Sequence, residues 1–243
     1  MRFADIPIIV TRAEPGASET VERLKARGLT AIPAPMLSLV ELPDNDMPDP
    51  SDLSGVVFTS ANGVRTYTAR RSDRHLPAWC VGPATAQAAR HEGFETVYES
   101  AGNAVDLAHF IVANTSPSER PLLHVANSAA TGTLRETLKS QGYRTIFAAL
   151  YEMRPAISLP EEVAKLLTQK ARTIILLHSE KGASAFAALT KARELANCIG
   201  VAISERASTP LERSNLSAIY TADTPNEDGL FAALEIALAT LSA

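Results

Sequence analysis

The feature that most restricts the fold of this chain is a regular alternation of short apolar runs with segments of helical periodicity. The runs are rich in Val, Ile and Leu, as expected for strands that are buried on both faces of a sheet. Strands that alternate with helices form parallel sheets covered by helices. The sequence therefore predicts an α/β fold throughout. The expected strands occupy residues 7–11, 30–42, 55–59, 78–81, 96–98, 121–126, 145–153, 173–178, 198–203 and 218–221.

Three glycines mark the expected ends of helices. Gly28, Gly93 and Gly142 close the segments LKARG, ARHEG and LKSQG, and a predicted strand follows each of them. Glycine accepts the left-handed backbone conformation that ends many helices, because it has no Cβ atom. These glycines are therefore predicted boundaries between a helix and the next strand.

Two of the expected strands are unusually long. Residues 30–42 and 145–153 exceed the roughly five or six residues of an average strand. Each is expected to leave its sheet and cross to another unit, and together they would form a two-stranded connector. Polar segments that contain proline, at residues 42–54, 115–121 and 154–160, are predicted loops or linkers.

Similar segments recur about half a chain apart. The segment ETVERLKARGLTAIPAPM, which ends at Met36, parallels TLRETLKSQGYRTIFAALY, which ends at Tyr151. Likewise FTSANGVRTY parallels LHSEKGASAF, since both predict a strand followed by Ser-x-x-Gly-x-x-x-aromatic. The sequence thus predicts a duplicated α/β unit, and the alternative is chance similarity between helices of like composition.

Composition and charge exclude several classes of protein. The 243 residues are 46% hydrophobic and 21% charged, which suits a globular chain of one large or two small domains. No uncharged apolar run approaches the roughly 18–20 residues of a membrane helix, and the start MRFADIPIIVTR predicts a first strand, not a signal peptide. A net charge of −4 without a basic cluster argues against nucleic-acid binding. Cys80 and Cys198 lie in apolar stretches, as expected for buried thiols in a reducing cytoplasm.

The motifs of common cofactor, metal and hydrolase sites are absent from the sequence. It contains no G-x-G-x-x-G fingerprint, P-loop, G-x-S-x-G elbow, H-E-x-x-H or C-x-x-C. The five histidines are scattered without the spacing of metal ligands. We therefore expect neither a cofactor nor a metal.

Small polar residues follow most of the predicted strands, at the end where open α/β sheets place their ligand sites. Each such segment precedes a predicted helix, whose first N–H groups and positive dipole end attract carboxylates or phosphates. The alternative is that Ser, Thr and Asn here only cap helices. These segments contain Thr11 and Arg12, Ser60 and Asn62, Thr85, Asn127 and Ser128, Ser179, and Ser208 and Thr209.

The order and spacing of several segments resemble one family over essentially the whole chain, the uroporphyrinogen-III synthases. No single segment is specific by itself. The segments are VVFTSANGV, CVGPATAQAA, GNAVDLA, the pair Tyr151-Glu152 after a long strand, LLHSEKGASAF and AISERASTPL.

The resemblance implies two similar parallel-sheet α/β domains, joined by a two-stranded antiparallel β connector, with a ligand cleft between them. Residues 1–34 and 155–243 would form a discontinuous first domain, and residues 39–149 the second. Residues 35–42 and 148–154 would be the connector strands.

The resemblance further implies an enzyme of tetrapyrrole (heme) biosynthesis, a lyase. Its substrate would be hydroxymethylbilane, cyclised with inversion of the terminal pyrrole ring through a spiro intermediate and with release of water. We expect a cytoplasmic monomer with no cofactor and no nucleic-acid or membrane partner. A transient contact with the deaminase that acts one step earlier in the pathway is a further possibility. The alternatives are a two-lobed cytoplasmic anion-binding sensor without catalysis and a different enzyme on a flavodoxin-like scaffold.

Tyr151 is the expected catalytic residue, as a proton donor to the departing hydroxyl, because it matches a family tyrosine. Its ring could instead pack at the connector, with its hydroxyl serving only a structural hydrogen bond. Arg12 is expected to bind a substrate carboxylate, although a salt bridge to Glu14 or another acid is an alternative. The remaining expected substrate-binding residues, each of which could instead cap a helix, are Ser60, Asn62, Thr85, Ser179 and Thr209.

Overall fold

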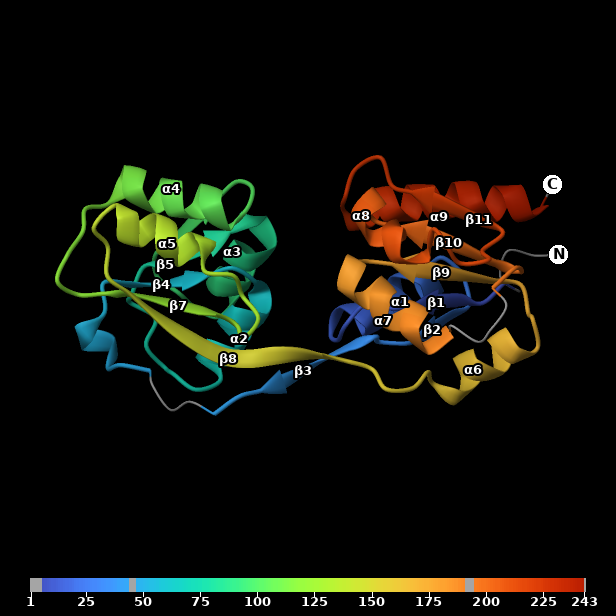
Figure 1. Cartoon of the computed structure of the whole chain (residues 1–243), viewed down its shortest axis with the longest axis horizontal. Coiled ribbons are helices and arrows are strands. Elements are labelled where there is room, and N and C mark those ends of the chain that lie inside the picture. The colour runs from blue at the N-terminus through green and yellow to red at the C-terminus, as the bar shows by residue number, and fades with distance from the viewer. Residues whose placement is uncertain (1–5, 44–46, 191–194, 243) are drawn as a thin grey trace. The chain divides into compact units, whose positions relative to one another are not determined.

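The computed structural model of the chain describes residues 6–43, 47–190 and 195–242. It divides into two compact units: Met1–Leu39 with Arg154–Ala243 form unit 1, and Val40–Met153 form unit 2. Figure 1 shows each unit as a sheet flanked by helices. The expected α/β fold is therefore confirmed.

Unit 1 contains a five-stranded parallel sheet in the order β11-β10-β9-β1-β2. Helices α1 and α9 pack on one face of the sheet, and α6, α7 and α8 pack on the other. Its strands are β1 (Ile8–Val10), β2 (Ala31–Pro33), β9 (Thr173–Leu177), β10 (Cys198–Ala202) and β11 (Ala218–Thr221). Its helices are α1 (Gly16–Ala26), α6 (Glu161–Thr168), α7 (Glu180–Thr190), α8 (Glu205–Ser208) and α9 (Glu227–Ser242), with the 3-10 turn η3 (Thr209–Leu211).

Unit 2 contains a six-stranded sheet in the order β3-β8-β7-β4-β5-β6. Helices α2 and α3 cover one face, and α4 and α5 cover the other. Its strands are β3 (Leu37–Glu41), β4 (Gly55–Phe58), β5 (Ala78–Val81), β6 (Val97–Ser100), β7 (Leu122–Asn127) and β8 (Thr145–Pro155). Its helices are α2 (Ala61–Thr68), α3 (Gly82–His91), α4 (Ala104–Asn114) and α5 (Thr133–Ser140), with the 3-10 turn η2 (Pro50–Asp52).

The chain passes between the units along β3 and β8, which are neighbours in the sheet order. The Leu42 N–H donates to the Leu150 carbonyl, and the Ala156 N–H donates to the Met36 carbonyl. Residue numbers thus rise along one strand while they fall along the other, so the pair is antiparallel. The expected two-stranded antiparallel connector is confirmed.

One expected strand proved to be two. Residues 30–42 divide into β2, in the sheet of unit 1, and β3, in the sheet of unit 2. Pro35 lies between them, and proline has no N–H to continue a strand ladder. The other long strand was predicted too short, because β8 continues to Pro155 into the expected polar break at 154–160.

Three predicted helix ends and both thiols lie as expected. Gly28, Gly93 and Gly142 have φ angles of 75°, 89° and 84°, the left-handed conformation that favours glycine. Cys80 and Cys198 are buried and free. Within the described ranges, no helix combines the length and apolar character needed to cross a membrane.

Candidate functional site

The carboxyl edge of each sheet, where its parallel strands end, holds most of the expected site residues. In unit 2, Ser60 follows β4 and caps α2, because its Oγ accepts a hydrogen bond of 3.2 Å from the Gly63 N–H. A Cβ atom on Gly63 would lie 3.0 Å from the Val125 carbonyl oxygen of β7. Glycine at this position therefore allows the first turn of α2 to lie close to the neighbouring strand.

Tyr151 is the seventh residue of β8, at the last position where β8 pairs with β7, and is only 3% exposed. Its hydroxyl is 2.6 Å from the Ser60 Oγ. The pairing of β7 with β8 shifts register between Ala126 and Asn127, so that Asn127 pairs with Tyr151. Such a bulge changes the direction of the side chains that follow it, and here it coincides with the position of Tyr151.

The hydroxyl of Tyr151 is protonated at neutral pH. Burial raises the pKa of Tyr151, while the hydrogen bond from Ser60 and a backbone hydrogen bond from Asn127 lower it in part. Because Ser60 already accepts from the Gly63 N–H, it retains its own proton and one further lone pair for Tyr151. Either hydroxyl can therefore be the donor in this pair.

Asn62 lies in the first turn of α2, beside the Ser60–Tyr151 pair. Its Nδ2 is 4.0 Å from the Met153 sulfur, and its Oδ1 accepts a 3.4 Å hydrogen bond from the exposed Arg65. The structure thus brings Ser60, Asn62 and Tyr151 together at the carboxyl edge of unit 2.

Thr85 follows β5 at the same edge, as the fourth residue of α3. It is 5% exposed. Within the part of the chain that the structure describes, its hydroxyl has no hydrogen-bond partner. Thr85 therefore does not cap a helix through its side chain.

In unit 1, Arg12 follows β1 and forms an ion pair with Glu227 at the start of α9. The Arg12 Nη1 lies 3.0 Å from the Glu227 Oε2. The same nitrogen donates to the Thr20 Oγ1 at 3.4 Å, and Thr20 donates to the Glu227 Oε1 at 2.7 Å. Glu14, the acid nearest to Arg12 in the sequence, instead accepts hydrogen bonds from Ser18. A salt bridge of Arg12 is thus present, with Glu227 as its acid.

His178 lies directly after β9, on the buried side of this ion pair. Its side chain is 6% exposed, and its Nε2 is 3.8 Å from the Glu227 Oε2. Burial lowers the pKa of His178, Glu227 raises it in part, and Arg12 lowers it further. Neither ring nitrogen has a hydrogen-bond partner among the described residues.

Ser179 and Thr209 of unit 1 make local hydrogen bonds. The Ser179 Oγ accepts from the Gly182 N–H at 3.1 Å, the same contact that Ser60 makes with Gly63. The repeated Ser-x-x-Gly segments therefore adopt the same local structure in the two units. Thr209 is exposed and donates to the Glu205 carbonyl at 3.1 Å.

The sequence did not single out Thr20, His178 or Glu227. Glu227 pairs with Arg12 although 215 positions of the sequence separate them. A pattern of neighbouring residues cannot predict such a pairing. Thr20 faces the sheet from the middle of α1 and is fully buried. One sequence signal could have pointed to Glu227. The polar segment before α9 predicts an acidic residue near the start of that helix.

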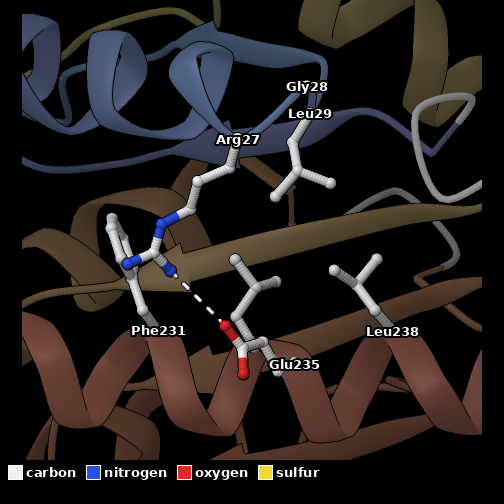
Figure 2. Close-up of a pocket in the computed structure, with 7 residues that line it drawn as sticks. Arg27, Gly28, Leu29, Phe231, Glu235 and Leu238 are labelled. Atoms are coloured by element: carbon white, nitrogen blue, oxygen red, sulfur yellow. Dashed lines mark hydrogen bonds and ion pairs between the residues drawn. The ribbon is translucent and has the colours of Figure 1, made fainter.

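Two of the cavities formed by the described residues lie in unit 1. One, of about 510 Å³, is at the carboxyl edge and is lined by Ser204, Glu205, Arg206, Thr221, Ala222, Asp223 and Pro225. The other, of about 320 Å³, lies between the end of α1 and α9. Figure 2 shows Arg27 reaching over Phe231 toward Glu235 in this second cavity. It adjoins Gly28 and Leu29, which precede β2, so it lies at the opposite edge of the sheet from Arg12. Among the described residues, no group of three or more His, Cys, Asp or Glu is placed to hold a metal ion.

Comparisons with known proteins point to one family. The family model described as "Uroporphyrinogen-III synthase HemD" matches residues 18–232. A uroporphyrinogen-III synthase of Chlorobaculum parvum is 24% identical over 223 residues, which cover 86% of this chain and 89% of that protein.

Solved structures show the same fold. A crystal structure of uroporphyrinogen-III synthetase from Helicobacter pylori aligns with a TM-score of 0.66 at 18% identity, covering 97% of this chain and 99% of that chain. A mutant uroporphyrinogen III synthase from Thermus thermophilus aligns with a TM-score of 0.54 at 14% identity, covering 98% and 99%. With the family model matching 215 consecutive residues of the 243, the chain belongs to the uroporphyrinogen-III synthase family.

Proposed function

We propose that this chain converts hydroxymethylbilane to uroporphyrinogen III and water. The observation that carries the proposal, together with the family, is the half-buried hydroxyl pair of Ser60 and Tyr151, whose oxygens are 2.6 Å apart. A linear bilane must lose a hydroxide to cyclise, and hydroxide is a poor leaving group. A proton donated as the C–O bond breaks turns it into water and lowers the barrier.

Tyr151 is the proposed proton donor. Its raised pKa keeps the phenol protonated at neutral pH, so the proton is present when the substrate binds. The hydrogen bond from Ser60 stabilises the phenolate that remains after proton transfer, since a hydrogen bond to a charged oxygen is stronger than one between neutral groups. The proton released from the pyrrole carbon at the end of ring closure restores the phenol, and the overall reaction therefore releases only water.

The rest of the task is conformational. Without a catalyst the bilane closes with its terminal ring in the original orientation, so the enzyme must hold the chain for attack at the more crowded carbon, through a spiro intermediate. Holding reactants in one geometry is a matter of proximity and orientation. The proposed contacts for the substrate carboxylates are Arg12, Ser60, Asn62, Thr85, Ser179 and Thr209.

We also propose that the enzyme works in the cytoplasm, where the two free thiols of Cys80 and Cys198 would remain reduced. A transient contact with the deaminase that supplies the bilane is part of this proposal, because the bilane is short-lived in water.

The test is to generate hydroxymethylbilane in situ, add the protein, oxidise the products and separate uroporphyrins I and III by chromatography. We expect isomer III in proportion to the protein added. Formation of isomer I alone, at the rate seen without protein, would overturn the proposed function.

A further inference from the structure

We infer that Glu227 is a positioning residue, which holds the guanidinium of Arg12 ready to bind one carboxylate of the substrate. The inference rests on the proposed function for the identity of that carboxylate. It concerns four segments of unit 1 that meet at the carboxyl edge: the second residue after β1, the middle of α1, the residue after β9, and the start of α9.

The contacts of Arg12 occupy one part of its guanidinium. Both of its hydrogen bonds, to Glu227 and to Thr20, use the Nη1 nitrogen. Among the described residues, Nε and Nη2 have no hydrogen-bond partner. These two nitrogens form one fork of the guanidinium, and such a fork matches the two oxygens of a carboxylate. Arg12 is thus anchored on one side and keeps two donors on the other.

Burial increases away from Arg12. The Arg12 side chain is 40% exposed, that of Glu227 is 18% exposed and that of His178 is 6% exposed. Thr20 is fully buried. The anchor is therefore buried and the arginine is accessible, which is the order that a binding site for an external carboxylate requires. An ion pair that served only to join α9 to the sheet would not need an accessible guanidinium.

A glycine provides the space in which Arg12 lies. A Cβ atom on Gly16, the first residue of α1, would collide with the Arg12 Nε and would be 2.7 Å from its Cζ. A side chain at residue 16 would occupy the place of the guanidinium, so only glycine permits the observed position. Because the end of an arginine side chain is flexible, Gly16→Ala should displace Arg12 and leave the fold intact.

Holding the Arg12 side chain in place before the substrate binds reduces the entropy cost of binding. A free arginine side chain loses rotamer entropy when it is immobilised, and this cost otherwise lowers the affinity for the substrate. The contacts with Glu227, Thr20 and Gly16 restrict the side chain before the substrate arrives. A carboxylate that keeps its contact with Arg12 throughout the reaction is bound equally in the ground state and the transition state, so loss of this contact should raise KM and leave kcat unchanged.

The experiment compares Gly16→Ala and Glu227→Gln with Asp228→Asn as the matched control. Asp228 is the next residue, it loses the same charge, and it pairs with the exposed Arg23 at 2.8 Å. With prepared hydroxymethylbilane we expect KM to rise roughly tenfold or more in both test variants, with kcat within about twofold of wild type and with no change for Asp228→Asn. Melting temperatures of all variants report on folding separately.

Several outcomes would overturn the inference. If Glu227→Gln lowers KM, Glu227 competes with the substrate for Arg12. If both variants lower the melting temperature and leave KM unchanged, the ion pair is only structural. Failure of the proposed function is a separate result, since wild-type protein would then form no isomer III. In that case, binding of uroporphyrin III, an octacarboxylate, to wild type and to Gly16→Ala would still test the carboxylate site: equal affinities would overturn it.

Discussion

The hydroxyl oxygens of Ser60 and Tyr151 lie 2.6 Å apart, although 91 positions of the sequence separate the two residues. The position of Ser60 is fixed by the start of α2, and that of Tyr151 by the pairing of β8 with β7. Each hydroxyl carries one proton, so only one of them donates across this contact. The other proton is available to a third group, which in the proposed reaction is the departing hydroxyl of the substrate.

Tyr151→Phe should slow the formation of isomer III by roughly 100-fold without abolishing it. The substitution removes the proton donor but keeps the ring in place, so the protein still holds the bilane. We expect the loss in kcat, measured by product chromatography under saturating substrate.

Tyr143→Phe is the matched control for that experiment. Tyr143 is also in unit 2, is 7% exposed and has its hydroxyl bonded to Thr115. Removal of the Tyr143 hydroxyl should leave kcat unchanged. Equal rates for wild type and Tyr151→Phe would show that the Tyr151 hydroxyl has only a structural role.

Ser60 and Ser179 make the same helix-capping contact, so comparing their alanine variants distinguishes the effect of capping from an effect on catalysis. Ser60→Ala and Ser179→Ala each remove the bond to an N–H three residues further on, 3.2 Å and 3.1 Å long, and each should cost about 1 kcal/mol of stability. Of these two serines, only Ser60 contacts Tyr151 and lowers its pKa, so Ser60→Ala should raise that pKa further and reduce kcat roughly tenfold. Ser179→Ala should act on KM instead. Similar kcat values for the two variants would contradict a role for Ser60 in proton transfer.

Thr85→Val tests a proposed substrate contact with little effect on the fold. Because the Thr85 hydroxyl has no partner among the described residues, the nearly isosteric valine should not reduce the unfolding free energy. If the hydroxyl binds substrate, KM should rise by roughly tenfold. An unchanged KM together with an unchanged melting temperature would remove Thr85 from the site.

Unit 2 should lose stability as the pH falls from about 6.5 toward 4. Burial and the nearby Arg135 lower the pKa of His124 to about 4, from the usual histidine value of 6.5. Between these values the unfolded chain binds a proton that the folded chain does not, so protonation favours unfolding. The loss amounts to up to about 3 kcal/mol, and it stops growing below the folded pKa.

Trp79, the single tryptophan, is buried in unit 2 and reports on its unfolding by fluorescence in urea. His124→Gln removes the titrating group and should flatten the pH dependence between pH 6.5 and 4. A variant with the wild-type pH dependence would assign the effect to other titratable groups of unit 2.

Arg70 should be essential to the stability of unit 2. Its side chain is 15% exposed, and its Nη2 donates to the carbonyls of Leu42 and Leu150 at 2.7 and 3.3 Å. Arg70→Ala should therefore cost roughly 2–3 kcal/mol, measured by Trp79 fluorescence in urea. Arg144, exposed and paired with an almost fully exposed Glu119, is the control, and its substitution should change stability by less than about 0.5 kcal/mol. Equal effects would show that the buried contacts of Arg70 contribute nothing.

Local patterns were sufficient for the secondary structure and for the fold class. Alternating apolar runs and helical periods predicted the α/β fold, and Gly28, Gly93 and Gly142 marked helix ends, because these features depend on residues that are close in the sequence. The three-residue gap around Pro35, between β2 and β3, was missed, since apolar residues on both sides continue the period of a strand although they belong to different sheets.

The sequence by itself determined which polar residues follow the strands, and hence that Ser60, Thr85 and Ser179 lie at the carboxyl edge of a parallel sheet. Only the tertiary structure decided which of them meet another group. Tyr151 reaches Ser60 because β8 and β4 flank the same strand, and Arg12 reaches Glu227 because α1 and α9 cover the same face of unit 1. Both contacts are long-range pairings that sheet order and helix packing create, and no local pattern encodes them.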